Sequence, residues 1–118
     1  MSKKETPAAD IAAETAPALI GQATEAQIDA WKRKHTNIFA IEADGHVAYF
    51  KSPDRQTIGM AMSLSNGGSD GMKFNNLLFD NCWLGGSEEI KTSDRLYLPA
   101  SAHMRQMIDV AEAQIKKL

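Results

Sequence analysis

A chain of 118 residues, 43% hydrophobic and 24% charged, has the size and composition of one soluble globular domain. Its net charge is −2 and its 13 Lys and Arg are scattered along the sequence, so no basic surface for nucleic acid is expected. No apolar run is long enough to span a membrane, and one cysteine cannot form an internal disulfide, so we expect a cytoplasmic protein without a membrane partner.

The first part of the chain differs in composition from the rest. It is rich in Ala, Thr, Glu and Pro and has no aromatic residue to anchor it. This composition predicts a disordered tail over residues 1–23 and a single globular domain over residues 24–118. Because a domain of this size buries a modest core, association would stabilise it, and a homo-oligomer is compatible with the sequence.

The first predicted helix follows Thr24, which has the capping-box partner Gln27 three residues later. Ile28, Trp31 and His35 follow at spacings of three and four, which predicts one buried face.

A β-hairpin is the clearest local prediction. Residues 37–43 and 46–51 are joined by Asp44-Gly45, a pair typical of a two-residue type I′ turn. This turn places Phe39 opposite Phe50 on the predicted core face. It also predicts that His46, beside the turn, is in solvent.

Two helices are predicted after the hairpin. Ser52 can cap the first, with Pro53 at its first position, and Asn66-Gly67-Gly68 ends it. Ser69 can cap the second, which Gly85-Gly86 ends. In the connector that follows, Ile90 is the predicted anchor, and Pro99 opens a final helix.

The second of these helices carries more apolar residues than one helix face holds, and the final helix has an apolar seam at spacings of four and three. We therefore expect both to contact a protein partner. The candidate interaction residues are Phe74, Leu78, Phe79 and Trp83 in the first of these two helices and Met104, Ile108, Ile115 and Leu118, with Ala111, in the seam.

No catalytic constellation is visible in the sequence. Cys82 has no basic residue beside it and is expected to be a small buried hydrophobe. His35, His46 and His103 lie in separate predicted elements with no metal-ligand spacing. We therefore expect no catalytic residue, no metal and no cofactor.

The elements combine into an α+β fold: an N-terminal helix, one antiparallel β-hairpin and then three helices packed around it. Four segments resemble small proteins of tailed bacteriophages and prophages, the tail assembly chaperones, in element order from about Thr24 to Leu118. These segments are Trp31-Lys32-Arg33-Lys34-His35, Tyr49-Phe50-Lys51-Ser52-Pro53-Asp54-Arg55, Asn81-Cys82-Trp83-Leu84-Gly85-Gly86 and Lys116-Lys117-Leu118.

The resemblance implies a non-enzymatic protein that binds tape-measure or tail-tube subunits during virion morphogenesis and keeps their apolar surface soluble. Two alternatives remain at this point. One is a structural component of the finished virion, and the other is a small-molecule-binding protein or enzyme with a pocket near Cys82.

Overall fold

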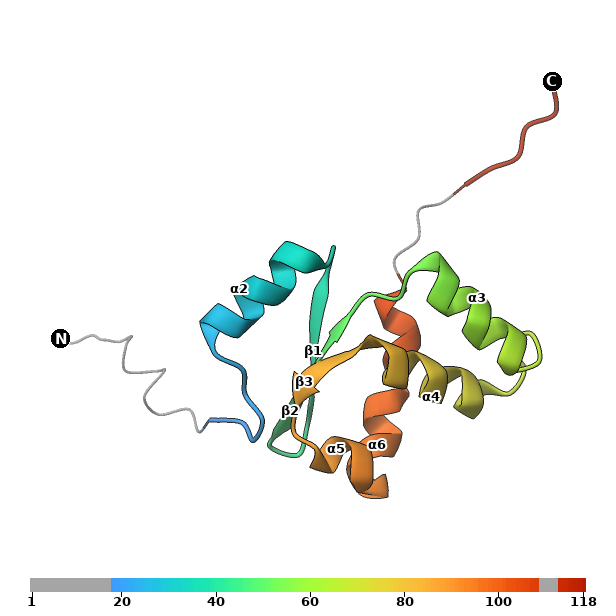
Figure 1. Ribbon diagram of the computed structural model, residues 1–118. Coiled ribbons are helices and arrows are strands. Elements are labelled where there is room, and N and C mark those ends of the chain that lie inside the picture. The colour runs from blue at the N-terminus through green and yellow to red at the C-terminus, as the bar shows by residue number, and fades with distance from the viewer. Residues whose placement is uncertain (1–17, 109–112) are drawn as a thin grey trace.

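A three-stranded antiparallel sheet in the order β1-β2-β3 forms the centre of an α+β fold in the computed structural model, which describes residues 18–108 and 113–118 (Figure 1). The predicted hairpin is confirmed as β1 (Ile38–Ala43) and β2 (His46–Lys51), with Phe39 opposite Phe50. Asp44 and Gly45 both have positive φ, 46° and 81°, as a type I′ turn requires.

The third strand, β3 (Trp83–Gly86), corrects a prediction. We expected Gly85-Gly86 only to end a helix, but these residues pair with Tyr49 and Ala48 along the second edge of β2. Gly86 has a φ of 133°, and a Cβ there would lie 2.5 Å from the Cα of Ala48. The close approach of β3 to β2 therefore requires glycine at this position.

Helix α2 (Glu25–Lys34) covers one face of the sheet (Figure 1). Its predicted capping box is confirmed, because Thr24 Oγ1 accepts from the Gln27 amide and Gln27 Oε1 accepts from the Thr24 amide. The Trp31 ring packs at 5.4 Å from that of Tyr49. The predicted face of α2 is half-buried, however, with no fully buried residue.

The other face of the sheet is covered by the second half of the chain (Figure 1). The elements there are α4 (Gly71–Cys82), the single turn α5 (Glu89–Thr92), α6 (Asp94–Ser101) and the 3₁₀ helix η1 (Met104–Met107), and α3 (Arg55–Leu64) packs against α4. Because elements lie on both faces, β2 is buried on both, and Val47 and Phe50 are each at most 1% exposed. Ile90 is buried, as predicted for the anchor of the connector.

Aspartates cap α3 and α4 in place of the predicted serines. Asp54, not Ser52, caps α3, with its Oδ1 accepting from the Thr57 amide at 2.8 Å. Asp70, not Ser69, caps α4. A carboxylate suits the positive end of a helix dipole, and the hydrogen bond from the Thr57 backbone lowers the pKa of Asp54.

The predicted final helix with its apolar seam is wrong in the described residues. Pro99 lies inside α6, which ends at Ser101, and the chain then tightens into η1. A 3₁₀ turn places residues three apart on the same side, and Met104 and Met107 are both buried. Residues 113–118 form neither helix nor strand, and Ala111 lies outside the described residues.

The packed chain begins before the predicted boundary at residue 24. Ile20 forms a parallel bridge with His46: its amide donates to the Gly45 carbonyl at 2.8 Å, and its carbonyl accepts from the Val47 amide at 2.9 Å. Residues 18–23 therefore do not behave as the tail we expected, and the rest of that predicted tail, residues 1–17, lies outside the described part of the chain.

Candidate functional site

Four of the predicted interaction residues belong to the core. Phe74, Leu78, Phe79 and Met104 are between 0% and 3% exposed, so they offer no surface to a partner of the folded chain. The reason is the position of α4, which packs against β2, α3, α6 and η1. The apolar surplus of this helix, in which we predicted a partner surface, is covered by the chain itself.

The remaining predicted interaction residues are scattered. Trp83 is half-buried, with its ring 5.6 Å from that of Phe50, and Ile108 is half-buried against the core. Ile115 and Leu118 are fully exposed at 101% and 108%. The structure therefore does not bring the eight predicted residues together into one surface.

Cys82 is fully buried, as predicted. Burial raises the pKa of its thiol to about 11, so the thiolate that cysteine chemistry needs is scarce near neutral pH.

Within residues 18–108 and 113–118, no group of three His, Cys, Asp or Glu could hold a metal ion. In the same ranges, no helix has the length and apolarity to cross a bilayer.

His46 lies in an environment that we did not predict. It is buried rather than solvated, and its Nδ1 lies 2.8 Å from Ser87 Oγ. The pair has the spacing of a nucleophile and a base, but both side chains are at most 7% exposed and neither lines a described hollow. The Ser87 amide also donates to the Val47 carbonyl at 2.9 Å. These two hydrogen bonds hold Ser87, the residue after β3, against β2 of the hairpin.

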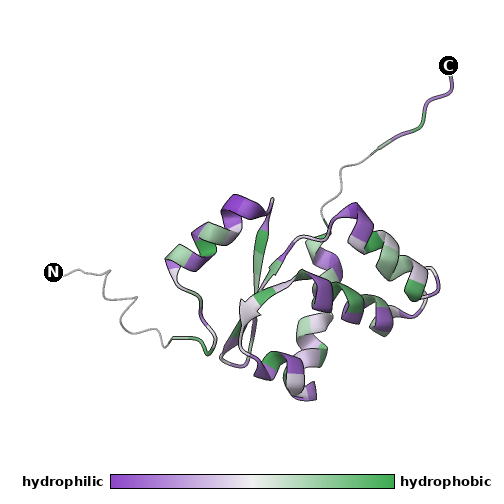
Figure 2. Cartoon of the chain, in the orientation of Figure 1, coloured by the Kyte–Doolittle hydropathy of each residue, from purple (hydrophilic) through white to green (hydrophobic). Residues whose placement is uncertain are grey.

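Four exposed large apolar side chains belong to α3 and the start of α4, whereas α6 exposes one, Leu98, at 49%. Met60, Met62 and Leu64 are 37%, 41% and 52% exposed, and Met72 is 61% exposed. We call these four residues the methionine surface. Ala61 is the one buried residue of α3, because among the described elements α3 packs extensively only against α4. Figure 2 shows this apolar helix at the margin of the molecule.

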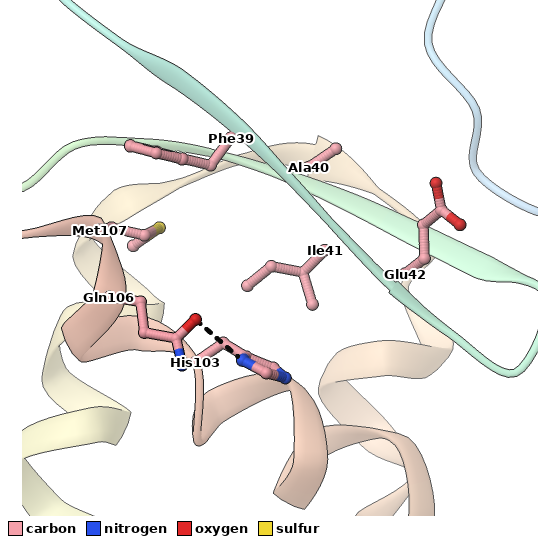
Figure 3. A pocket seen from close by; sticks show the side chains of 7 residues that line it. All are labelled: Phe39, Ala40, Ile41, Glu42, His103, Gln106 and Met107. Carbon is pink, nitrogen blue, oxygen red and sulfur yellow. Dashed lines mark hydrogen bonds between the residues drawn. The ribbon is translucent and has the colours of Figure 1, made fainter.

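A groove lies between the edge strand β1 and the segment that contains α6 and η1 (Figure 3). Its main hollow has a volume of about 360 Å³, and a second one of about 210 Å³ continues it toward the hairpin turn, sharing Ile41, Glu42 and His103. The main hollow is lined by Phe39, Ala40, Ile41, Glu42, His103, Gln106 and Met107. We call these two hollows the β1 groove.

The side chains of the β1 groove come from both of its walls. In Figure 3, Ile41 points into the space beneath β1, whereas Ala40 and Glu42 point away from it. On the opposite wall, Nδ1 of His103 lies 3.3 Å from Oε1 of Gln106. A hollow with apolar walls and a few polar groups suits an apolar side chain of a peptide or a small molecule.

Sequence reasoning missed both surfaces. The signal for the methionine surface was present, because α3 carries apolar residues around much of its circumference, as α4 does. The signal for the groove was weaker, because it needs the long-range packing of α6 on β1.

Comparisons of the chain with protein-family models, with curated proteins and with solved structures find no significant match.

Proposed function

We propose that this protein is a non-enzymatic protein-binding module that uses the methionine surface to hold an apolar segment of its partner. Following the sequence resemblance, the partner is a tape-measure or tail-tube subunit, and the protein acts as a tail assembly chaperone in the host cytoplasm. The observation that carries the proposal is that half of the ten residues of α3 are apolar, whereas only Ala61 is buried.

A helix on the outside of a globular domain ordinarily turns its apolar stripe toward the core. In α3, Met60 and Leu64 are one helical turn apart on one side of Ala61, and Met62 lies on the other side, beside Gly68. Three apolar side chains thus lie on the two sides of the buried Ala61 and remain partly exposed. Methionine adapts its shape to different partners, which suits a protein that binds exposed apolar segments of incomplete assemblies.

The size of the surface argues for reversible binding. Full burial of a Leu or Met side chain is worth about 1.5–3 kcal/mol, and these side chains are already partly buried. The total gain for four residues is therefore a few kcal/mol before the cost of association is subtracted. A chaperone must release its client, and a homo-oligomer would strengthen such weak contacts by multivalency.

The direct test is capture of a tail protein by a double variant, Met60→Asp with Leu64→Asp. Its matched control is Gln56→Asp with Ser63→Asp, which adds the same charge to exposed polar positions of the same helix. Each variant is coexpressed with candidate tape-measure and tail-tube subunits and purified by an affinity tag. We expect the control to capture the client and the first variant to lose it, with both circular dichroism spectra unchanged. Equal capture by the two variants would contradict the proposal.

Purified finished particles separate a chaperone from a structural virion component. A chaperone is absent from purified finished particles, whereas a structural component is present in stoichiometric amount. Detection of the chain in such particles by mass spectrometry would replace the proposed role with a structural one.

A further inference from the structure

The outer edge of β1 presents unpaired backbone groups. The Ser52 amide donates to the Asn37 carbonyl at 3.2 Å, so hydrogen-bonded pairs between β1 and β2 fall at alternate residues from Asn37 onward. Phe39 and Ile41 therefore direct their backbone groups toward β2. Ala40 and Glu42 direct theirs outward, and in the described part of the chain β1 has no second neighbouring strand.

An exposed edge of this kind can accept one more strand. Directly beneath it, the β1 groove offers a space into which Ile41 points (Figure 3). Backbone groups at the edge together with an apolar hollow below it suit an extended segment that inserts an apolar side chain.

The chain itself carries a segment of this kind at its C-terminus. Residues 113–118, Ala-Gln-Ile-Lys-Lys-Leu, lie in neither helix nor strand, and every one of their side chains is exposed. Ile115 buries nothing in this position, at 101% exposure. The chain reaches the segment from Met107, which is itself part of the groove wall beside Phe39.

We propose that residues 113–118 bind in the β1 groove of the same chain, as a fourth strand parallel to β1 that reversibly covers its edge. The direction follows from the fold, because Met107 lies at the Phe39 end of the groove and Arg95 at the Ala43 end. The ten residues after Ile108 can extend to roughly 33 Å, whereas the six residues of β1 span roughly 20 Å. The segment can therefore reach the whole groove without a second molecule.

Side-chain alternation and charge support this occupant. Alternate residues of a strand point to opposite faces, so a register that places Ile115 in the groove with Ile41 places Lys116 on the face of Glu42. The Glu42 carboxylate is exposed there and attracts a lysine. The short connection gives the segment an effective concentration on the order of millimolar, so a weak contact suffices to dock it. This inference does not depend on the proposed function.

The test is paramagnetic relaxation enhancement on the full chain with a spin label at Leu118→Cys. The buried thiol of Cys82 is protonated at neutral pH and does not compete for the label. We expect the amide signals of Ala40 and Glu42 to lose more than half of their intensity, while those of Gln56 and Ser63 on α3 keep theirs. Uniform intensities would overturn the proposal.

Two variants and a mixing experiment sharpen the outcome. Ile115→Asp in the labelled chain should restore the Ala40 and Glu42 signals, whereas Ile115→Val should leave them attenuated. Amide hydrogen exchange at Glu42 should be roughly tenfold faster in Ile115→Asp than in the unlabelled wild type, as expected for an edge that is covered most of the time. If attenuation arises only when label and ¹⁵N are on different molecules, the occupant is a second copy and the intramolecular proposal is wrong.

Discussion

Helices α3 and α4 are consecutive and similarly apolar, yet they have opposite environments. Helix α4 buries Phe74, Leu78, Phe79 and Cys82, whereas α3 buries Ala61 alone. The difference lies in their neighbours. Helix α4 packs against β2, α6 and η1 as well as α3, whereas α3 packs extensively only against α4. Apolar content therefore does not locate a partner surface unless the surrounding elements are known.

The two helices also differ in their aromatic contacts. The Phe79 ring lies 5.1 Å from that of Phe50, 5.5 Å from that of Trp83 and 4.7 Å from that of Tyr97, so α4 connects β2, β3 and α6 through one side chain. Contacts between aromatic rings stabilise a fold by more than the burial of their apolar area alone. Within its described contacts, α3 has no such aromatic side chain that connects it to several elements.

The largest expected effect is on α4. Leu78→Ala removes a side chain that is 0% exposed and leaves a cavity between the sheet and the helices. We expect a loss of about 2–5 kcal/mol in the free energy of unfolding, measured by urea denaturation. A loss below about 1 kcal/mol would mean that the surrounding side chains fill the cavity and that α4 is not more tightly packed than α3.

A second substitution in α4 tests the chemistry of the core. Cys82→Ser replaces a buried thiol by a hydroxyl with stronger hydrogen-bonding needs, and we expect a cost of about 1–3 kcal/mol in unfolding free energy. Client capture should persist at temperatures where the variant is folded. If Cys82→Ala folds normally but abolishes a turnover of the wild-type protein, Cys82 would be a catalytic nucleophile and the proposed function would be wrong.

The pH dependence of stability gives a smaller effect from the same residue. Burial raises the pKa of the Cys82 thiol from 9.0 to about 11, so the folded state holds its proton more tightly than the unfolded state does. This contribution to stability is complete below pH 9 and is lost as the pH rises through 11. Burial also raises the pKa of Tyr97, which adds a further loss at high pH. Cys82→Ala should therefore reduce, but not remove, the decline in unfolding free energy above pH 9.

Sequence patterns predicted what is local. The hairpin register follows from a two-residue turn and a period of two, and the capping box of α2 follows from two side chains three residues apart. The caps of α3 and α4 were displaced by one or two residues because serine and aspartate are both good caps and adjacent segments decide between them.

Sequence patterns failed where distant segments decide the structure. Trp83–Gly86 became a strand because β2 offers it an edge, and no local signal in a Gly-Gly pair states this. His46 is buried because Ser87, 41 residues away, lies against it. For the same reason, the sequence placed a partner surface on α4, which the fold covers, and not on α3, of which the fold buries Ala61 alone.

The smallest expected effect completes the comparison of the two helices. Leu64→Ala makes in α3 the same substitution as Leu78→Ala in α4, but at a side chain that is 52% exposed. The free energy of unfolding should change by no more than about 0.5 kcal/mol, because little buried area and no core cavity are involved. Client capture should weaken in this variant and remain intact in folded Leu78→Ala. If Leu64→Ala instead destabilised the protein by as much as Leu78→Ala, α3 would be part of the core in solution, and the methionine surface could not be the binding site.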